Sequence, residues 1–190
     1  MLIFKKKYYF IIESIKDIEL RKLKKKNKIV IIYRNKKSKD KISELSNFRS
    51  ICKSKKIKFF IANNIHLCKM LKADGIYISA SNYNLRYTSY KKLNLEIIGA
   101  AHNRKEILIK KKQGCSSLIF SRLFETEYDY KKGYLGIIKF NLLNISNNNE
   151  LIPLGGIRIG NLKKLKMVDC SSFALFSEVK KKPAIIDRLF

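Results

Sequence analysis

The sequence predicts an α/β protein, a (β/α)8 or TIM barrel that forms a compact single domain over residues 1–190. Short apolar runs rich in β-branched and aromatic residues recur along the whole chain, and most segments between them have helical spacing. The runs are continuous rather than alternating, as expected for parallel strands buried on both faces. A set of eight such strands with intervening helices favours the barrel, although 190 residues is short beside the roughly 250 that are typical.

The expected strands share an apolar centre, and most of them close on a polar residue or a glycine. In chain order they are Tyr8–Glu13 (YYFIIE), Ile29–Arg34 (IVIIYR), Lys58–Asn63 (KFFIAN), Gly75–Ala80 (GIYISA), Glu96–His102 (EIIGAAH), Ser116–Arg122 (SSLIFSR), Glu150–Gly156 (ELIPLGG) and Ser172–Ser177 (SFALFS).

Helical spacing or a start signal marks the segments between the later strands. Asn103 followed by Glu106 is a capping-box pattern, and Pro183 is well placed near a helix start. The expected helices are Ser38–Ser50, Asn64–Leu71, Asn103–Lys112, Leu135–Leu143, Gly160–Met167 and the tail after Pro183.

A doubly wound open sheet is the alternative to the barrel. That fold usually carries a glycine-rich turn after its first strand. The stretch YYFIIESIKD, which begins at Tyr8, has no glycine in that position. The barrel is therefore the preferred interpretation.

The net charge of +27 raises the question of nucleic acid, because clustered Lys and Arg bind phosphate backbones. The lysines are instead spread over nearly every segment, and Lys, Asn, Ile, Phe and Tyr share A/T-rich codons. Genome composition alone would produce this profile, so we do not expect nucleic acid as a partner. The charge should still steer small anionic substrates toward the protein.

The cysteines indicate a reducing compartment. Cys52, Cys68, Cys115 and Cys170 are scattered, without a C-x-x-C pair or a companion His at ligand spacing, which argues against zinc and against a disulfide framework. No secretion signal is recognisable, and no apolar stretch approaches the roughly 20 residues that span a bilayer. We expect a cytoplasmic protein with no membrane contact, and the sequence sets no oligomeric state.

In a barrel the C-terminal strand ends build the catalytic face. The residues at these ends form a polar and basic ring with few carboxylates, which favours an anion site over a hydrolase or a divalent-metal cage. This ring includes Arg34, Lys36, Asn63, Asn64, Asn82, His102, Thr126, Gly155, Gly156 and Ser177.

The glycine pair in LGGIRIGNL is the sharpest local feature. Gly155 and Gly156 allow the backbone to approach a ligand closely and to hold a phosphate with N–H groups, and Ser177 would complete that site. An ordinary βα turn that needs glycine is the alternative reading.

The other polar strand ends each have a structural alternative. Arg34 and Lys36 lie two apart and could share a diphosphate, or they could simply be solvated. Asn63 and Asn64 could contact substrate or cap the next helix. His102 could act as an acid or base near neutral pH or pack at the barrel rim.

Taken in order, these strand ends resemble the thiamine-phosphate synthase family and its relative thiazole tautomerase, both (β/α)8 barrels. IYRNK resembles the family's Q-L-R-E-K, FFIANN resembles its strand ending in Asn-Asp, and KADGIYIS is similar to A-D-G-V-H-L-G. SRLFETEYDYKKGYLG resembles G-P-I-F-x-T followed by a lysine and Leu-Gly. LGGI matches the glycine pair, and ALFSEV matches the final serine turn.

The resemblance implies a transferase of thiamine biosynthesis that binds small phosphorylated substrates. It joins 4-amino-5-hydroxymethyl-2-methylpyrimidine diphosphate to thiazole phosphate and releases pyrophosphate. By position, Arg34, Lys36 and Asn63 would hold the diphosphate, with Lys131 or Lys132 assisting. On the thiazole side, the expected ligands are Thr126, Gly155, Gly156 and Ser177.

The resemblance also implies Mg²⁺, carried in the family by two aspartates whose places are taken here by Asn64 and Asn82. Two neutral amides would hold Mg²⁺ weakly. Two alternatives therefore stay open. One is a metal-independent thiazole tautomerase that uses His102 as its acid/base, and the other is a phosphate-ligand-binding barrel that has lost its chemistry.

Overall fold

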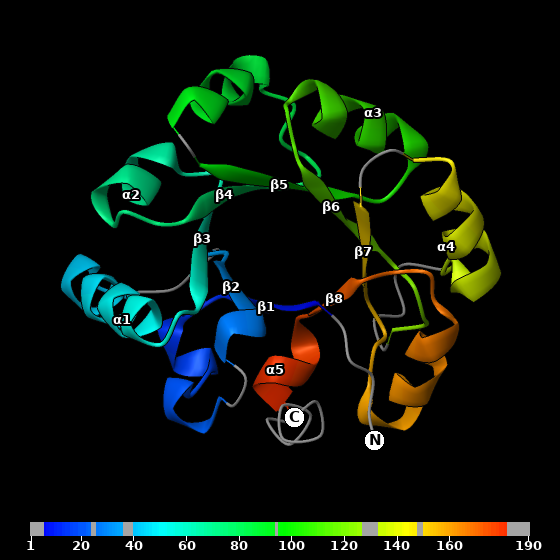
Figure 1. Cartoon of the computed structure of the whole chain (residues 1–190), viewed down its shortest axis with the longest axis horizontal. Helices are drawn as coiled ribbons and strands as arrows, with labels where there is room; N and C mark the ends of the chain where they lie inside the picture. Colours follow the sequence, from blue (N-terminus) through cyan, green and yellow to red (C-terminus); the bar gives the residue numbers. More distant parts are fainter. Residues whose placement is uncertain are drawn as a thin grey trace.

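The computed structural model describes residues 6–23, 26–35, 40–93, 95–126, 133–147 and 150–181. Its strands form one eight-stranded parallel sheet in the order β7-β6-β5-β4-β3-β2-β1-β8. β7 and β8 are neighbours without a hydrogen-bonded ladder between them, so the barrel is nearly closed. Figure 1 shows this ring of strands with the helices around its outside. The predicted (β/α)8 barrel is confirmed.

All of the expected strands are present, and each ends one or two residues before its expected end. The residues that close these runs have left the ladder and follow the strand ends instead. The strands are β1 Lys7–Ile12, β2 Ile29–Tyr33, β3 Lys58–Ala62, β4 Gly75–Ile78, β5 Glu96–Ala101, β6 Ser117–Ser121, β7 Glu150–Leu154 and β8 Ser172–Leu175.

The α-helices are α1 Ile42–Ser54, α2 Ile65–Met70, α3 Arg104–Lys112, α4 Gly136–Ile145 and α5 Ser177–Lys181. Single turns and longer stretches of 3₁₀ helix make other connections: η1 Ile15–Asp17, η2 Leu20–Lys22, η3 Lys26–Lys28, η4 Leu85–Leu93 and η5 Ile159–Met167. The helix expected over Gly160–Met167 is therefore 3₁₀ rather than α, and η4 was not expected. The expected helix after Pro183 and the expected start at Ser38 lie outside the described residues.

Alternation along the strands divides the core into two layers. One cluster fills the barrel interior with Tyr9, Ile11, Val30, Ile32, Phe60, Tyr77, Ile98, Ala100, Ile119, Ile152 and Ala174. The strand residues between them belong to a second cluster that packs against the helices. Register brings the interior residues together, because Tyr9 pairs with Val30 and Tyr77 pairs with Ile98. Both faces of each strand are therefore buried, which explains the continuous apolar runs.

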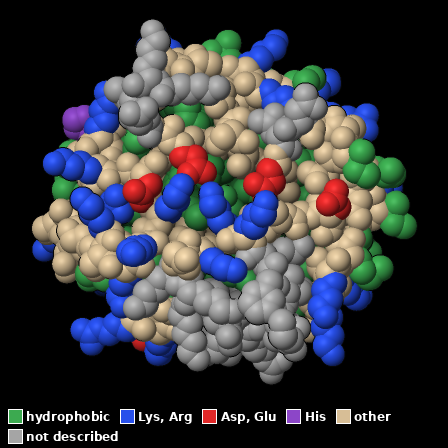
Figure 2. Space-filling model, viewed as in Figure 1, with side chains coloured by type: hydrophobic (Ala, Val, Ile, Leu, Met, Phe, Trp, Pro, Cys, Tyr) green, Lys and Arg blue, Asp and Glu red, His purple; other side chains and the backbone are tan. Residues whose placement is uncertain are grey.

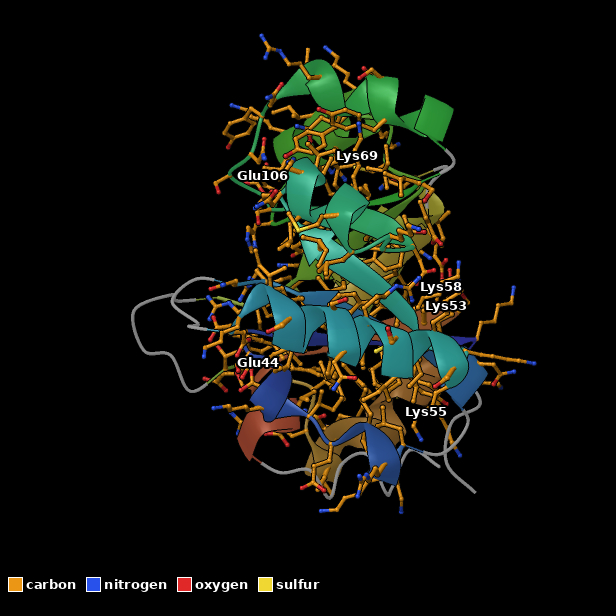
Figure 3. The ribbon with its side chains drawn as sticks, turned by 90° about the vertical axis from the view of Figure 1, so that its left-hand side faces the viewer. Glu44, Lys53, Lys55, Lys58, Lys69 and Glu106 are labelled. Atoms are coloured by element: carbon orange, nitrogen blue, oxygen red, sulfur yellow. The ribbon has the colours of Figure 1, made fainter. Side chains whose placement is uncertain are left out.

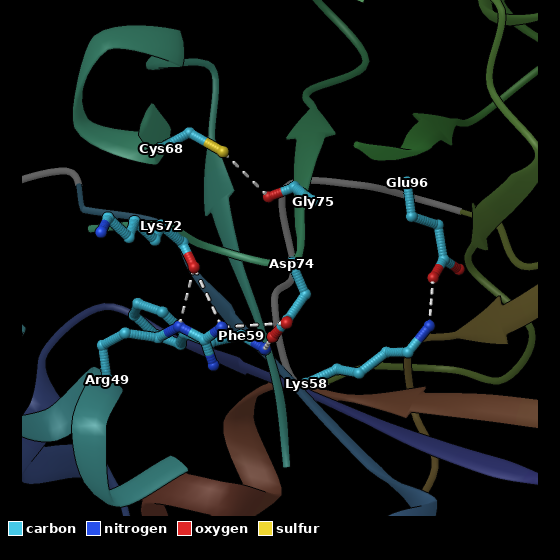
Figure 4. Close-up of polar contacts among 8 residues, drawn as sticks. All are labelled: Arg49, Lys58, Phe59, Cys68, Lys72, Asp74, Gly75 and Glu96. Carbon is cyan, nitrogen blue, oxygen red and sulfur yellow. Dashed lines mark hydrogen bonds and ion pairs between the residues drawn. The ribbon is translucent and has the colours of Figure 1, made fainter. Parts of the chain in front are cut away.

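Ion pairs tie the helices and strands together at the end where the strands begin. Arg49 of α1 donates to Lys72 O and to Asp74 Oδ1, at 2.9 Å from Nη2 in both cases, while Asp74 Oδ2 accepts from Phe59 N–H at 2.7 Å (Figure 4). Lys58 Nζ lies 2.5 Å from Glu96 Oε2. Figure 3 shows Lys58 on the opposite side from Glu44 and Glu106.

Figure 2 looks onto this end and shows acidic side chains near its middle, flanked by Lys and Arg. At this end, the carboxylates of Asp74 and Glu96 therefore hold elements together.

The four cysteines are free, and three of them are buried. Within the described ranges, the model holds no helix whose length and hydropathy would let it span a bilayer. Burial raises the pKa of Cys52 to about 12 and that of Cys68 to about 11, from an ordinary value of 9.0.

Alkaline pH should destabilise the protein through these thiols. Above pH 9 the unfolded chain loses thiol protons that the folded chain keeps, so stability falls as pH rises from 9 toward 11 or 12. Each thiol should contribute a slope of about 1.4 kcal/mol per pH unit. Urea unfolding of wild type and Cys68→Ala at several pH values checks this. An equal slope in both proteins would contradict the assignment to Cys68.

Candidate functional site

Alternation along the strands predicts which side chains enter the mouth of the barrel. Beyond Ile32, Tyr77, Ala100 and Ile119, the next inward positions are Arg34, Ser79, His102 and Ser121. Each lies at or just after the C-terminal end of its strand. Arg34 and His102 were expected at this catalytic face as members of the polar ring.

Arg34 is held at this mouth by contacts from three strands. Its guanidinium carbon lies 4.6 Å from the centre of the Phe176 ring, after β8, and Nη2 lies 4.0 Å from Glu13 Oε1, after β1. Burial raises the pKa of the Tyr77 phenol on β4, and the charge and hydrogen bond of Arg34 oppose that rise. Arg34 Nε is buried and has no hydrogen-bond partner within the part of the chain that the structure describes. This N–H is therefore a hydrogen-bond donor that the described residues leave unsatisfied.

Asn63 connects the ends of β3 and β4. It adopts a left-handed backbone with φ of 56°, which Asn tolerates better than most residues. Its Nδ2 donates to Ser79 Oγ at 2.7 Å, and its Oδ1 accepts from Ser79 N–H and from Asn82 Nδ2 at 3.0 and 3.1 Å. Tyr87 donates to Asn63 O at 2.9 Å. Asn63 is thus fixed in an exposed network at the rim.

Asn64 and Asn82 use their side-chain oxygens locally. Asn64 is the N-cap of α2, and its Oδ1 accepts from Leu67 N–H at 2.9 Å. Asn82 Oδ1 accepts from Asn84 N–H at 3.0 Å, while its Nδ2 donates to Asn63 and to Tyr87. The capping alternative is therefore confirmed for Asn64. Because Mg²⁺ is usually bound through carboxylates, these two neutral, already bonded amides do not fit it.

A buried pair at the C-terminal end of α3, Lys110 within the helix and its C-cap Gln113, holds the loop that carries Asn82. Lys110 and Gln113 are both fully buried, and Lys110 Nζ donates to Asn82 O at 2.5 Å and to Gln113 Oε1 at 2.9 Å. Gln113 Nε2 donates to Asn82 O and Asn84 O, each at 2.9 Å. Burial lowers the pKa of Lys110, while Cys115 and Glu106 oppose the fall. This pair sets the position of residues 82–84 from behind.

His102 follows β5 and has an exposed imidazole. Its backbone N–H donates to Glu106 Oε2 at 2.6 Å. Asn103 is the N-cap of α3 and accepts from Glu106 N–H at 2.9 Å, as the predicted capping box requires, but the Glu106 carboxylate accepts from His102 N–H and Asn103 Nδ2 rather than from the Asn103 backbone. Nδ1 lies 3.2 Å from Ser121 O. A carbonyl oxygen can only accept, so Nδ1 carries a proton in this contact, and in the neutral tautomer with this bond Nε2 is the nitrogen with the lone pair. The ring is therefore oriented as a base could be.

The ends of β6 and β7 approach each other closely. Leu123 N–H donates to Leu154 O at 2.9 Å, and Phe124 N–H donates to Gly155 O at 3.0 Å. Gly155 and Gly156 have φ of 97° and 66°, and a Cβ on Gly156 would lie 2.3 Å from Glu125 O. The close approach of the β6 loop thus requires glycine at both positions, as expected for an ordinary βα turn. The role of Gly155 and Gly156 in phosphate binding stays a prediction.

Arg122 and Thr126 lie in the same β6 loop. Arg122 Nη1 donates to Thr126 Oγ1 at 2.7 Å, and a Cβ on Gly155 would meet Arg122 Cγ at 2.9 Å. Two residues expected to bind substrate, Thr126 and Gly155, are therefore joined through Arg122. Ser177 is half-buried and begins α5, directly after Phe176, which contacts Arg34.

Three of the predicted site residues, Lys36, Lys131 and Lys132, lie outside the described residues. Several partners of the site were missed in the sequence: Glu13, Tyr87, Lys110, Gln113 and Phe176. Lys110 had a signal, because it lies three residues after the buried Ile107 and therefore on the inward side of α3. Tyr87 had none, since its η4 helix shows no apolar periodicity.

Known proteins with similar sequences belong to the family that the strand ends of this chain resemble. The thiamine monophosphate synthase model matches residues 8–179. The thiamine-phosphate synthase of a Prochlorococcus marinus strain is 28% identical over 153 residues, which are 79% of this chain and 44% of that protein. That of Clostridioides difficile (strain 630) is 23% identical over 151 residues, 78% of this chain and 71% of that protein.

The fold has a solved counterpart. A thiamine phosphate pyrophosphorylase from Pyrococcus furiosus superimposes with a TM-score of 0.68 at 16% identity, over 98% of both chains. The first three curated relatives are matched over 44%, 40% and 59% of their length, so the chain spans about half of them. Since the family model covers nearly the whole chain, this protein belongs to the thiamine monophosphate synthase family.

Proposed function

We propose that the protein is a thiamine-phosphate synthase, which joins hydroxymethylpyrimidine diphosphate to thiazole phosphate and releases pyrophosphate. Family membership over residues 8–179 supports the reaction class. The single structural observation that carries the proposal is Arg34 at the barrel mouth, with a buried Nε that lacks a partner among the described residues. A guanidinium in this position suits a diphosphate, which accepts charge-assisted hydrogen bonds from Arg.

In the proposed reaction the bond between the pyrimidine methylene carbon and the diphosphate oxygen breaks. The bonding electrons leave with pyrophosphate, and the resulting pyrimidine cation is captured by the lone pair of the thiazole nitrogen. Arg34 would bind the departing anion, and Thr126 with the Gly155–Gly156 turn would orient the thiazole phosphate. Catalysis then consists mainly of positioning and of stabilising the negative charge that develops on the leaving group.

Coupled product formation tests this function. Purified protein is incubated with both substrates and Mg²⁺, and thiamine phosphate is quantified by mass spectrometry alongside released pyrophosphate. We expect the two in equal amounts, and pyrophosphate release should require the thiazole phosphate. Pyrophosphate released without thiamine phosphate, or no product with any divalent cation, would contradict a synthase and would favour a ligand-binding barrel.

A thiazole tautomerase is the second candidate, because His102 enters the mouth with its Nδ1 bonded to Ser121 O. As a tautomerase, the protein would use Nε2 of His102 to move a proton on a thiazole phosphate carboxylate. Replacing His102 by Ala should abolish a tautomerase, whereas a synthase should lose at most about tenfold of its rate. Both activities are measured for wild type, His102→Ala and His66→Ala, whose imidazole is exposed on α2. A synthase activity abolished by His102→Ala alone would contradict the proposed roles.

A further inference from the structure

The chain lacks carboxylates at the two positions where its family resemblance places metal ligands. Asn64 and Asn82 carry no charge, and each side-chain oxygen already accepts a backbone N–H, from Leu67 and Asn84 respectively. No cluster of three or more His, Cys, Asp or Glu side chains suited to a metal ion occurs in the described residues. Asn82 also donates its amide N–H groups to Asn63 and Tyr87, so its side chain is fully used within the rim network.

A fixed positive charge lies behind the same loop. The ammonium group of Lys110 is 2.5 Å from Asn82 O, in a fully buried position where solvent screens it weakly. The neighbouring groups from the packed elements are Gln113, the Tyr83 ring at 5.8 Å, Glu106 and Cys115. Gln113 and Tyr83 are neutral, whereas the carboxylate of Glu106 opposes the charge of Lys110. The ammonium group is the charge in direct contact with the loop, at Asn82 O, so it disfavours a divalent cation near residues 82–84.

We infer that the mouth of the barrel binds a diphosphate group directly, through Arg34 and without a divalent cation, and that Lys110 is a positioning residue of this metal-free site. The inference rests on the proposed function, since it names how the diphosphate of that reaction is held. In this arrangement Arg34 supplies the contact with the anion. Lys110 holds the loop that carries Asn82, so that the side-chain amides of Asn63 and Asn82, rather than a metal ion, line the rim beside Arg34.

Binding of inorganic pyrophosphate, measured by calorimetry with EDTA and then with Mg²⁺, tests the inference. Wild type should bind pyrophosphate in EDTA, and Mg²⁺ should change the Kd by less than about threefold. The double variant Asn64→Asp, Asn82→Asp should bind at least about tenfold more weakly in EDTA, because two added carboxylates repel the anion, and Mg²⁺ should restore its affinity. Wild-type binding that needs Mg²⁺, or no binding in either buffer, would overturn the inference.

Lys110→Met tests the positioning role, with Lys112→Met on the exposed side of α3 as its matched control. Lys110→Met should weaken pyrophosphate binding in EDTA by about three- to tenfold, whereas Lys112→Met should leave it unchanged. In the Asp-containing double variant, Lys110→Met should tighten Mg²⁺ binding, which a purely structural role would not do. If Mg²⁺ binding stays the same, Lys110 has no such role. Should Lys110→Met fail to fold, the Asn→Asp variant alone decides on the metal.

Failure of this inference and failure of the proposed function are distinguishable. Thiamine phosphate formed only with Mg²⁺ would leave the synthase in place and overturn the metal-free site. Equal pyrophosphate binding with and without Mg²⁺, in a protein that forms no thiamine phosphate, would keep the site and overturn the function.

Discussion

Replacing Arg34 by Ala is expected to lower kcat/KM for thiamine phosphate formation by about 10²- to 10³-fold, the usual loss when one group that stabilises a developing anion is removed. The guanidinium of Arg34 lies inside the barrel mouth. Its Nε–H is buried and has no hydrogen-bond partner among the described residues. The guanidinium is also held in place by Phe176 and Glu13, so its orientation is set before substrate arrives. Pyrophosphate binding should fall with the rate.

Two further variants make this test specific. Arg34→Lys keeps the charge but loses the planar fork, so its rate should lie between those of wild type and Arg34→Ala. Lys53→Ala, in the exposed last turn of α1 at the end where the strands begin (Figure 3), removes a positive charge away from the mouth and should leave kcat/KM unchanged. Equal activity of Arg34→Ala and wild type would remove Arg34 from the site.

Gly156→Ala is expected to damage both stability and thiazole phosphate binding. A left-handed non-glycine residue costs about 1–3 kcal/mol, and here the new Cβ would also lie 2.3 Å from Glu125 O and 2.6 Å from Phe124 C. These are backbone atoms, so the β6 loop that carries Thr126 must move away. We expect a lower free energy of unfolding and a higher KM for thiazole phosphate, with a smaller effect on pyrophosphate binding.

Gly160→Ala is the matched control, because a Cβ at that position meets no atom within 4 Å. It should leave the free energy of unfolding and both KM values close to those of wild type. Unfolding curves and steady-state kinetics on the three proteins measure these effects. A Gly156→Ala protein as stable as wild type would contradict the close packing of the two loops.

The strands could be predicted from the sequence because each is buried on both faces and therefore reads as an unbroken apolar run. The ends of these runs also located the mouth, since the first polar residue after a buried strand lies at the rim. Arg34 and His102 were found in this way. Local capping rules likewise predicted Asn64 and Asn103 at the starts of α2 and α3, where the structure has them.

Segments between strands that lack a regular spacing of apolar residues could not be predicted. The sequence of η4 shows no clear apolar periodicity, yet its Tyr87 is buried and bonds to Asn63 and Asn82 at the rim. The spacing from Ile107 indicates that Lys110 lies on the inward side of α3, but its partners could not be predicted, because the fold brings Asn82 O from a distant loop to the ammonium beside Oε1 of Gln113. Such contacts depend on tertiary structure rather than on sequence spacing.

The most direct test of the proposed function is the formation of thiamine phosphate from both substrates in metal-free buffer. With EDTA present, the protein should produce thiamine phosphate and pyrophosphate in equal amounts, at a rate within about tenfold of that with Mg²⁺, since Arg34 binds the leaving group directly. Absence of product with EDTA and with every divalent cation tested would contradict the synthase, and product strictly dependent on Mg²⁺ would contradict the metal-free diphosphate site.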